Sequence, residues 1–279
     1  MGSFSDLVNS WSSQLTIYPR QEAESLIHWL LEHHLGMRRV DMMQFMGEKD
    51  LPDTLKNDFE RLKTGEPIQY ILGHGPFYGR EFSVSPATLI PRSETEELVH
   101  LILKENPAEG LTILDIGTGT GCIPITLKLE MKAARVFGLD VSEEALEVAI
   151  ENGKILHAQV DFLKCDILKE TPILPPLDIL ISNPPYVAWS EKSQMHPNVL
   201  EFEPHLALFV SDDDPLLFFR VIGEKGKLLL KPGGKLYFES NEQYAFQVAE
   251  LLNRMGYSEV NVLKDINGKN RMIAAHLTK

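Results

Sequence analysis

The segment Asn183-Pro184-Pro185-Tyr186 has the residue types needed to hold a planar NH2 group, and it follows the apolar run LDILIS. Proline fixes φ and donates no hydrogen bond, so the backbone carbonyl of Pro184 is held in a preset direction. That carbonyl and the side-chain oxygen of Asn183 would accept the two protons of the NH2 group. The ring of Tyr186 would pack against its flat face. The segment predicts an enzyme that directs a nitrogen toward an electrophile. A rigid turn is the alternative interpretation.

A glycine-rich loop lies upstream in the segment LDIGTGTGC, where Gly117, Gly119 and Gly121 follow another apolar run. Glycine lets a backbone approach a ligand closely and adopt positive φ. The GxGxG spacing differs from the GxGxxG of dinucleotide-binding folds, and the loop lacks the GKS or GKT of a phosphate-binding loop. The loop is therefore a candidate cofactor site, and a tight turn without a ligand is the alternative.

Acidic residues near this loop indicate the kind of cofactor. Asp140 ends the run ARVFGLD, where a carboxylate can accept both ribose hydroxyls of a nucleoside. The loop and this acid together predict an adenosine cofactor, either NAD or S-adenosylmethionine. Asp115 favours the second, because it could bind the ammonium of a methionine tail and would repel a pyrophosphate. Asp166 and Leu168 follow the third apolar run and are candidates for the adenine pocket, although a simple strand end is the alternative.

These residues need elements that bring them together, and the chain from Leu111 onward provides them. Strand-like apolar runs alternate with helix-like segments, which predicts an α/β fold with a doubly wound, mostly parallel sheet of seven strands. In such sheets, ligands bind at the carboxyl ends of the strands. The last two runs, SEVNVLKDI and NRMIAAHL, have no helix between them, so we expect one antiparallel strand at or near an edge. Ser93 and Glu96 predict a capping box at the start of a helix.

The first part of the chain has a helical period instead. Two apolar stripes follow that period, namely Leu26, Trp29, Leu30 and Leu31, and then Leu55, Phe59 and Leu62. A segment rich in glycine and proline follows and is typical of a β-hairpin. We therefore expect a helical domain over residues 1–75, a hairpin linker over 76–91 and a catalytic domain over 92–279.

Composition narrows the class of protein. The chain has 279 residues and a net charge of -13, which disfavours a nucleic-acid partner because no dense basic cluster offsets it. Two cysteines, Cys122 and Cys165, make neither a disulfide framework nor a CxxC metal site, and no metal is expected. The start of the chain lacks the features of a signal peptide, and no apolar run approaches ~20 residues. We expect a cytoplasmic, monomeric protein without a membrane partner.

The sequence resembles the HemK/PrmC family of protein-glutamine methyltransferases. The resemblance covers residues 66–276, and its most specific segments are LIPRSETEELV and ISNPPYV. It implies the fold of S-adenosylmethionine-dependent methyltransferases, with a helical N-terminal domain that helps to recognise the substrate. The implied reaction is methylation of the glutamine amide in the Gly-Gly-Gln motif of peptide chain release factors. S-adenosyl-L-methionine would be the donor, and S-adenosyl-L-homocysteine the product.

The resemblance gives roles to residues 117–121, Asp140 and residues 183–186, and the positions of Asp115 before the glycine loop and of Asp166 and Leu168 after a strand add these three. The cofactor-binding residues would be Asp115, Gly117, Thr118, Gly119, Thr120, Gly121, Asp140, Asp166, Leu168 and Asn183. The catalytic residues would be Asn183, Pro184 and Tyr186, and the substrate would contact these three and Pro185. The chain departs from the family pattern at Ser93, at 239–241 and at 211–214. Because of the last departure, the resemblance assigns no role to residues 211–214.

Other functions fit parts of the sequence. A glutamine methyltransferase acting on a ribosomal protein would use the same motifs. A nucleic-acid amino methyltransferase would use the same Asn-Pro-Pro-Tyr chemistry on a flipped base, but it would want a basic channel. A noncatalytic module that binds release factors is a further hypothesis, and failure to bind S-adenosylmethionine would favour it. An NAD oxidoreductase is disfavoured by Asp115.

Overall fold

The computed structural model describes residues 4–38, 40–41 and 51–278. Parts of the predicted helical domain, at residues 1–3, 39 and 42–50, therefore lie outside the described residues, as does residue 279. The chain forms two compact units. One unit comprises residues 1–74 together with 196–202, and the other comprises residues 75–195 together with 203–279.

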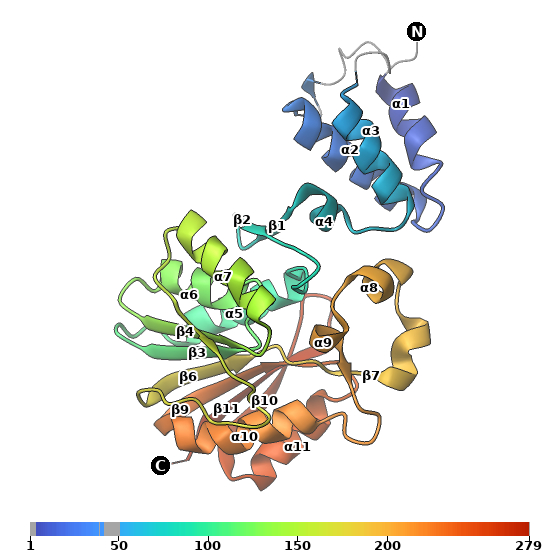
Figure 1. Cartoon of the computed structure of the whole chain (residues 1–279). Coiled ribbons are helices and arrows are strands. Elements are labelled where there is room, and N and C mark those ends of the chain that lie inside the picture. Colours follow the sequence, from blue (N-terminus) through green and yellow to red (C-terminus); the bar gives the residue numbers. More distant parts are fainter. Residues whose placement is uncertain (1–3, 39, 42–50, 279) are drawn as a thin grey trace. The chain divides into compact units, whose positions relative to one another are not determined.

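The first unit is helical (Figure 1). Its helices in the first part of the chain are α1 (Phe4–Ser12), α2 (Arg20–Leu35), α3 (Asp53–Lys63) and α4 (Ile68–Leu72). The predicted stripe on α3 is confirmed, because Leu55, Phe59 and Leu62 are all buried in the core of this unit. The stripe on α2 is only partly right: Leu30 and Leu31 are buried, but Leu26 and Trp29 are half-buried, and Ile27, which the predicted stripe omitted, is fully buried. A helix covered on two sides buries a wider face than one stripe describes.

A distant segment of the chain belongs to the same unit. Residues 196–202, which include helix α8 (Pro197–Phe202), are grouped with the helical core. The ring of His196 stacks on Tyr18 with 5.6 Å between the ring centroids, and its Nε2 lies 3.3 Å from the carbonyl oxygen of Ile17. No pattern in the sequence indicated that this segment leaves the α/β part of the chain.

A two-stranded hairpin follows the first helices, formed by β1 (His74–Phe77) and β2 (Arg80–Ser83). The two residues between the strands, Tyr78 and Gly79, have φ of 49° and 71°. Two successive residues with positive φ are typical of the tight turns that match the twist of paired strands. The Tyr78 backbone N–H donates to Glu96 Oε1 at 2.8 Å, which anchors the turn.

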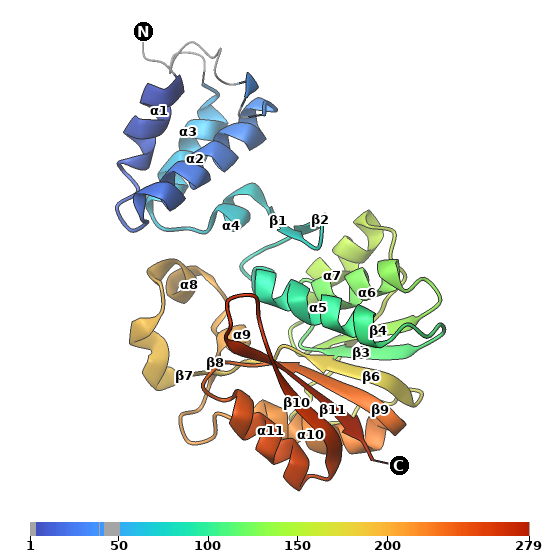
Figure 2. The same ribbon diagram turned by 180° about the vertical axis from the view of Figure 1, so that it is seen from behind.

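The second unit is built on a seven-stranded sheet with the strand order β10-β11-β9-β6-β3-β4-β5. The strands are β3 (Thr112–Ile116), β4 (Arg135–Asp140), β5 (Asp161–Lys164), β6 (Leu177–Ser182), β9 (Leu230–Glu239), β10 (Tyr257–Lys264) and β11 (Asn270–Leu277). Strands β9, β6, β3, β4 and β5 are parallel, and β11 is antiparallel to both β9 and β10. The predicted fold class, with an antiparallel strand near one edge, is confirmed (Figure 2).

Helices cover both faces of this sheet (Figure 1). One face carries α5 (Ser93–Glu105), α6 (Cys122–Glu130) and α7 (Glu143–Ile155), and the other carries α10 (Leu217–Leu229) and α11 (Ala245–Arg254). Successive residues of β3 alternate between two cores: Ile113 packs with α5 and α6, and Leu114 with α10 and α11. Because both faces are buried, the central strands are almost continuously apolar.

The remaining elements connect β6 to α10. They are β7 (Val187–Ala188), the 3-10 helix η3 (Trp189–Gln194), α9 (His205–Leu208) and β8 (Phe209–Val210), in addition to α8. Strands β7 and β8 pair in parallel. None of the helices that the structure describes is long and apolar enough to cross a membrane.

The predicted capping box at α5 is wrong. The cap position is Arg92, and Ser93 is already the first helical residue. The hydroxyl of Ser93 donates to the neighbouring Glu94, while Glu96 is engaged by the hairpin turn. The side chain of Glu96 therefore bonds to the hairpin turn, and the local hydrogen bond at the start of α5 that the pattern indicated is not formed.

Candidate active site

The glycine loop joins β3 to α6 at the carboxyl end of the sheet. Gly117 and Thr118 donate their backbone N–H groups to the carbonyl of Leu139, at 2.8 and 3.0 Å, which ties the loop to the neighbouring strand. Gly121 has φ of 76°, and a Cβ there would lie 3.0 Å from the side chain of Ile125. Both the conformation and the close packing require glycine at position 121.

Asp140 connects this loop to the next one. Its Oδ2 accepts a hydrogen bond from the backbone N–H of Gly119 at 2.9 Å, and its Oδ1 accepts one from Ser142 at 3.0 Å. Ser142 in turn caps α7 by accepting from the N–H of Ala145 at 3.1 Å. Burial raises the pKa of Asp140, and the backbone donors oppose that rise. Each carboxylate oxygen keeps a further lone pair for a ligand.

Asp115 lies one position before the end of β3 and is completely buried. Neither of its carboxylate oxygens has a well-formed hydrogen bond within the described chain. Burial raises the pKa of this carboxyl from 3.8 to about 7, although the nearby hydroxyl of Thr118 opposes the rise. A buried carboxylate without a full partner is costly, so the position is suited to a cationic ligand that would compensate it.

Asp166 and Leu168 follow the end of β5. The Oδ1 of Asp166 accepts from the backbone N–H of Leu168 at 3.0 Å, which shapes the turn. Its Oδ2 pairs with Lys169 at 2.8 Å, and this contact lowers the pKa of Asp166. Leu168 is an exposed apolar side chain, at 37%, in a position where a flat ligand could cover it.

The Asn-Pro-Pro-Tyr segment begins directly after β6. The hydroxyl of Ser182 donates to the carbonyl of Ile116 at 2.7 Å, which fixes the end of β6 beside the end of β3. The Nδ2 of Asn183 donates to the hydroxyl oxygen of Thr95 at 3.3 Å. The ring of Tyr186 packs against the apolar core, and burial raises the pKa of its hydroxyl.

One cavity brings most of the predicted site residues together, with a volume of about 470 Å³. Its walls include Gly117, Thr118, Gly119, Thr120, Asp140, Asp166, Leu168, Asn183, Pro184 and Pro185. Asp115, Gly121 and Tyr186 do not line it, although each is next in sequence to a residue that does. The cavity therefore opens at the carboxyl ends of β3, β4, β5 and β6, where this kind of sheet binds ligands.

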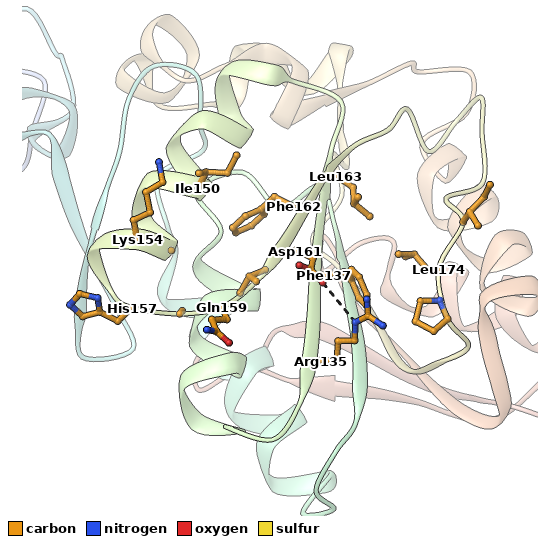
Figure 3. A pocket seen from close by; sticks show the side chains of 15 residues that line it. Arg135, Phe137, Ile150, Lys154, His157, Gln159, Asp161, Phe162, Leu163 and Leu174 are labelled. Carbon is orange, nitrogen blue, oxygen red and sulfur yellow. Dashed lines mark ion pairs between the residues drawn. The ribbon is translucent and has the colours of Figure 1, made fainter.

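A second cavity is larger, about 930 Å³, but it lies along the edge strand β5 and the first half of β4 (Figure 3). Arg135 and Asp161, the first residues of β4 and β5, both line it and form an ion pair at 3.8 Å. It contains none of the predicted site residues. The size of a cavity alone therefore does not identify the candidate site. The position of the cavity relative to the carboxyl ends of the strands is the better guide.

The sequence analysis missed three buried polar residues near the site, namely Thr95, Glu203 and Glu239. Glu203 accepts hydrogen bonds from the backbone N–H of Ile90 at 3.2 Å and from Arg92 at 2.5 Å. Glu239, at the end of β9, accepts from the hydroxyl of Thr95 at 2.7 Å. A glutamate at the carboxyl end of a buried strand, in the run KLYFES, was a usable signal, because a charge there needs a partner.

Comparisons with known proteins agree with this arrangement. Residues 6–73 match the family model described as "PrmC N-terminal domain", and residues 107–274 match the one described as "Methyltransferase domain". A protein of Bacteroides thetaiotaomicron named "Release factor glutamine methyltransferase" is 46% identical over 266 residues, which cover 93% of this chain and 95% of that protein. A protein of Flavobacterium psychrophilum with the same name is 42% identical, with 92% of this chain and 93% of that protein covered.

The fold also has solved neighbours. The crystal structure of a methyltransferase from Pyrococcus furiosus superimposes with a TM-score of 0.56, at 18% identity, over 80% of this chain and 100% of that chain. At this level of identity, the likeness shows the shared fold.

Proposed function

Because this chain belongs to the release factor glutamine methyltransferase family, we propose that it methylates the glutamine of the Gly-Gly-Gln motif in peptide chain release factors. The methylated atom is the side-chain amide nitrogen, and S-adenosylmethionine is the methyl donor. The observation that carries the proposal is the position of Asn183 and Pro184, which line the same cavity as the glycine loop.

The residues around this cavity fit the proposed cofactor. S-adenosylmethionine supplies a methyl group activated by a sulfonium charge, and it also carries an ammonium group and an adenosine. The buried carboxylate of Asp115 lacks a full partner, so we assign it to the ammonium. Asp140 would accept from the ribose hydroxyls, and the backbone of residues 117–121 would surround the tail. Asp166 would accept from the exocyclic amine of the adenine, while Leu168 covers the ring.

The chain's own groups would orient the target glutamine. The Oδ1 of Asn183 and the carbonyl of Pro184 would each accept one proton of the target NH2 group. Two acceptors at fixed positions prevent the amide from rotating, and Pro185 keeps the backbone rigid. Holding the nitrogen in line with its electrophile can lower a barrier by ~7–11 kcal/mol. Tyr186 packs against the apolar core and does not line the cavity, so its ring would act by anchoring this rigid segment.

These acceptors also activate the nitrogen. An amide nitrogen is a weak nucleophile because its lone pair is delocalised. Hydrogen bonds from its protons to Asn183 and Pro184 increase electron density on the nitrogen as it pyramidalises. No strong base is required before attack, because the proton can leave once the nitrogen is cationic. Preorganised contacts of this kind strengthen as charge develops.

The proposal extends to the protein's partners and setting. The helical unit would help to grip the intact release factor. The net charge of -13 supports a protein substrate over a nucleic acid. We place the enzyme in the cytoplasm, where release factors meet ribosomes, and expect it to act as a monomer.

A labelling experiment tests this function. The full chain is incubated with methyl-labelled S-adenosylmethionine and, separately, with a purified release factor, ribosomal proteins or DNA. We expect label in the release factor and none in a matched factor whose Gly-Gly-Gln glutamine is changed to alanine. Label in ribosomal proteins or DNA, with none in the release factor, would contradict the proposal and favour the alternative substrates.

A further inference from the structure

Three side chains from three different elements form a hydrogen-bonded chain behind the Asn-Pro-Pro-Tyr segment. The Nδ2 of Asn183 donates to Thr95 Oγ1 at 3.3 Å, and Thr95 Oγ1 donates to Glu239 Oε2 at 2.7 Å. Thr95 belongs to α5 and Glu239 ends β9, and both are buried. Asn183 is the most exposed of the three, and both Asn183 and Thr95 line the cavity, whereas Glu239 does not.

The order of donors and acceptors in these three hydrogen-bonded side chains follows when Glu239 is ionised. An ionised carboxylate can only accept, so the hydroxyl of Thr95 must give its single proton to Glu239. The hydroxyl oxygen then has only lone pairs left for Asn183, which must present its NH2 group. The two ends of an asparagine amide have nearly the same shape, so packing alone cannot choose between them.

We propose that Thr95 and Glu239 are positioning residues that turn the Asn183 amide so that its oxygen, and not its nitrogen, meets the target glutamine. This inference rests on the function proposed above. With Nδ2 directed at the buried Thr95, Oδ1 is left for the cavity, and it has no partner within the described residues. A flipped amide would present two donors to the NH2 group of the substrate, and no hydrogen bond could form.

The surroundings of Glu239 act on its ionised form in both directions. Burial raises its pKa to about 7, while the Thr95 hydroxyl and the charges of Arg271 and Arg92 favour the ionised form. The negative charge of Glu94 acts in the same direction as burial. A buried carboxylate lowers the stability of the fold unless it accepts a hydrogen bond, and here the neighbouring donor is the hydroxyl of Thr95. In its ionised form, Glu239 is therefore held in contact with Thr95, and this buried contact sets the direction of the hydrogen bond from Asn183.

A pair of substitutions at position 95 separates orientation from packing. Thr95→Val keeps the shape and removes the hydroxyl, whereas Thr95→Ser keeps the hydroxyl. We expect Thr95→Val to lower kcat for the release factor roughly tenfold, the effect of losing one orienting hydrogen bond. Its KM and its affinity for S-adenosylmethionine should stay within about twofold of the parent. Thr95→Ser should retain most of the parental kcat.

Thr126→Val is the matched control. Thr126 lies on α6, is fully buried, and its hydroxyl has no hydrogen-bond partner within the described chain. It does not line the cavity, so this substitution should leave kcat unchanged. A parental kcat in Thr95→Val, or an equal loss in Thr95→Ser and Thr95→Val, would overturn the positioning role while leaving the methyltransferase function intact.

A measurement on the parent protein is independent of activity and of the folding of any variant. In isotope-labelled protein, the side-chain NH2 protons of Asn183 should show nuclear Overhauser effects to the methyl group of Thr95. Their absence would overturn the proposed orientation. If the parent protein methylates no release factor, the proposed function fails, and the spectrum still shows which end of the Asn183 amide meets Thr95.

Discussion

Replacing Asp115 by asparagine should have opposite effects on folding and on cofactor binding. The carboxyl is completely buried, and burial raises its pKa from 3.8 to about 7. Because one pKa unit corresponds to ~1.4 kcal/mol, this rise corresponds to about 4 kcal/mol. The free energy represents the cost of ionising Asp115 inside the folded protein instead of in the unfolded chain.

The sign of the pH dependence follows from the direction of this rise. An acid with a higher pKa in the folded state binds more protons when folded than when unfolded, between about pH 4 and about pH 7. Its cost is therefore absent below about pH 4 and complete above about pH 7. An asparagine side chain cannot ionise, so the cofactor-free Asp115→Asn variant should gain about 4 kcal/mol of stability relative to the parent between about pH 4 and about pH 8.

Urea unfolding of both proteins across this pH range measures the effect. Any constant difference between asparagine and a protonated aspartate cancels, so the pH dependence of the stability difference is diagnostic. Asp178→Asn is a matched control in the same sheet, because Asp178 pairs with Lys231 at 2.8 Å. That substitution should lower stability. A stability difference that does not change with pH would refute the assigned burial cost of Asp115.

The same variant should lose cofactor affinity. An ammonium held by Asp115 would form a charge-assisted contact, which is worth ~1.5–3 kcal/mol. Calorimetry with S-adenosylmethionine at about pH 8 should show weaker binding by Asp115→Asn, although the variant folds more stably. Parental affinity in the variant would show that the ammonium lies elsewhere.

Two further substitutions test the other walls of the cavity. Asn183→Ala should leave the fold and cofactor affinity nearly intact and reduce the rate of single-turnover methyl transfer by ~10²–10³-fold. Asn183→Asp should retain more activity, because a carboxylate still accepts both protons. Transfer at the parental rate in Asn183→Ala would show that the Asn-Pro-Pro-Tyr segment is purely structural. Asp140→Ala should weaken S-adenosylmethionine binding by ~1.5–3 kcal/mol in calorimetry, and an unchanged affinity would exclude the ribose contact.

The fold was predictable because its strands are buried on both faces and separated by amphipathic helices. Each buried run, such as LDILIS, therefore stood out between polar segments. The gathering of Gly117, Asp140 and Asn183 at one cavity could be predicted to the same extent, since all three lie at the ends of such runs. Their common position at the cavity is a consequence of parallel strands, whose carboxyl ends meet at one edge.

Other features depend on tertiary contacts that no local pattern encodes. The side chain of Glu96 bonds to the backbone of Tyr78 and not to the start of its own helix. Thr95 and Glu239 are 144 positions apart in the chain and become partners only in the folded sheet. The short strands β7 and β8 have two residues each, too few for a periodic signal.

The segment 196–202 makes the helical unit discontinuous in sequence, because residues 75–195 are inserted between its two parts. On the ribosome, the first 74 residues emerge early, but the unit cannot be completed until residue 202 has left the exit tunnel. The nascent chain must therefore hold an unfinished helical core while β3 to β6 are synthesised. In the finished protein, three covalent crossings join the two units, so a protease cutting once between residues 74 and 75 leaves them connected through residues 196–202, which remain packed on Tyr18.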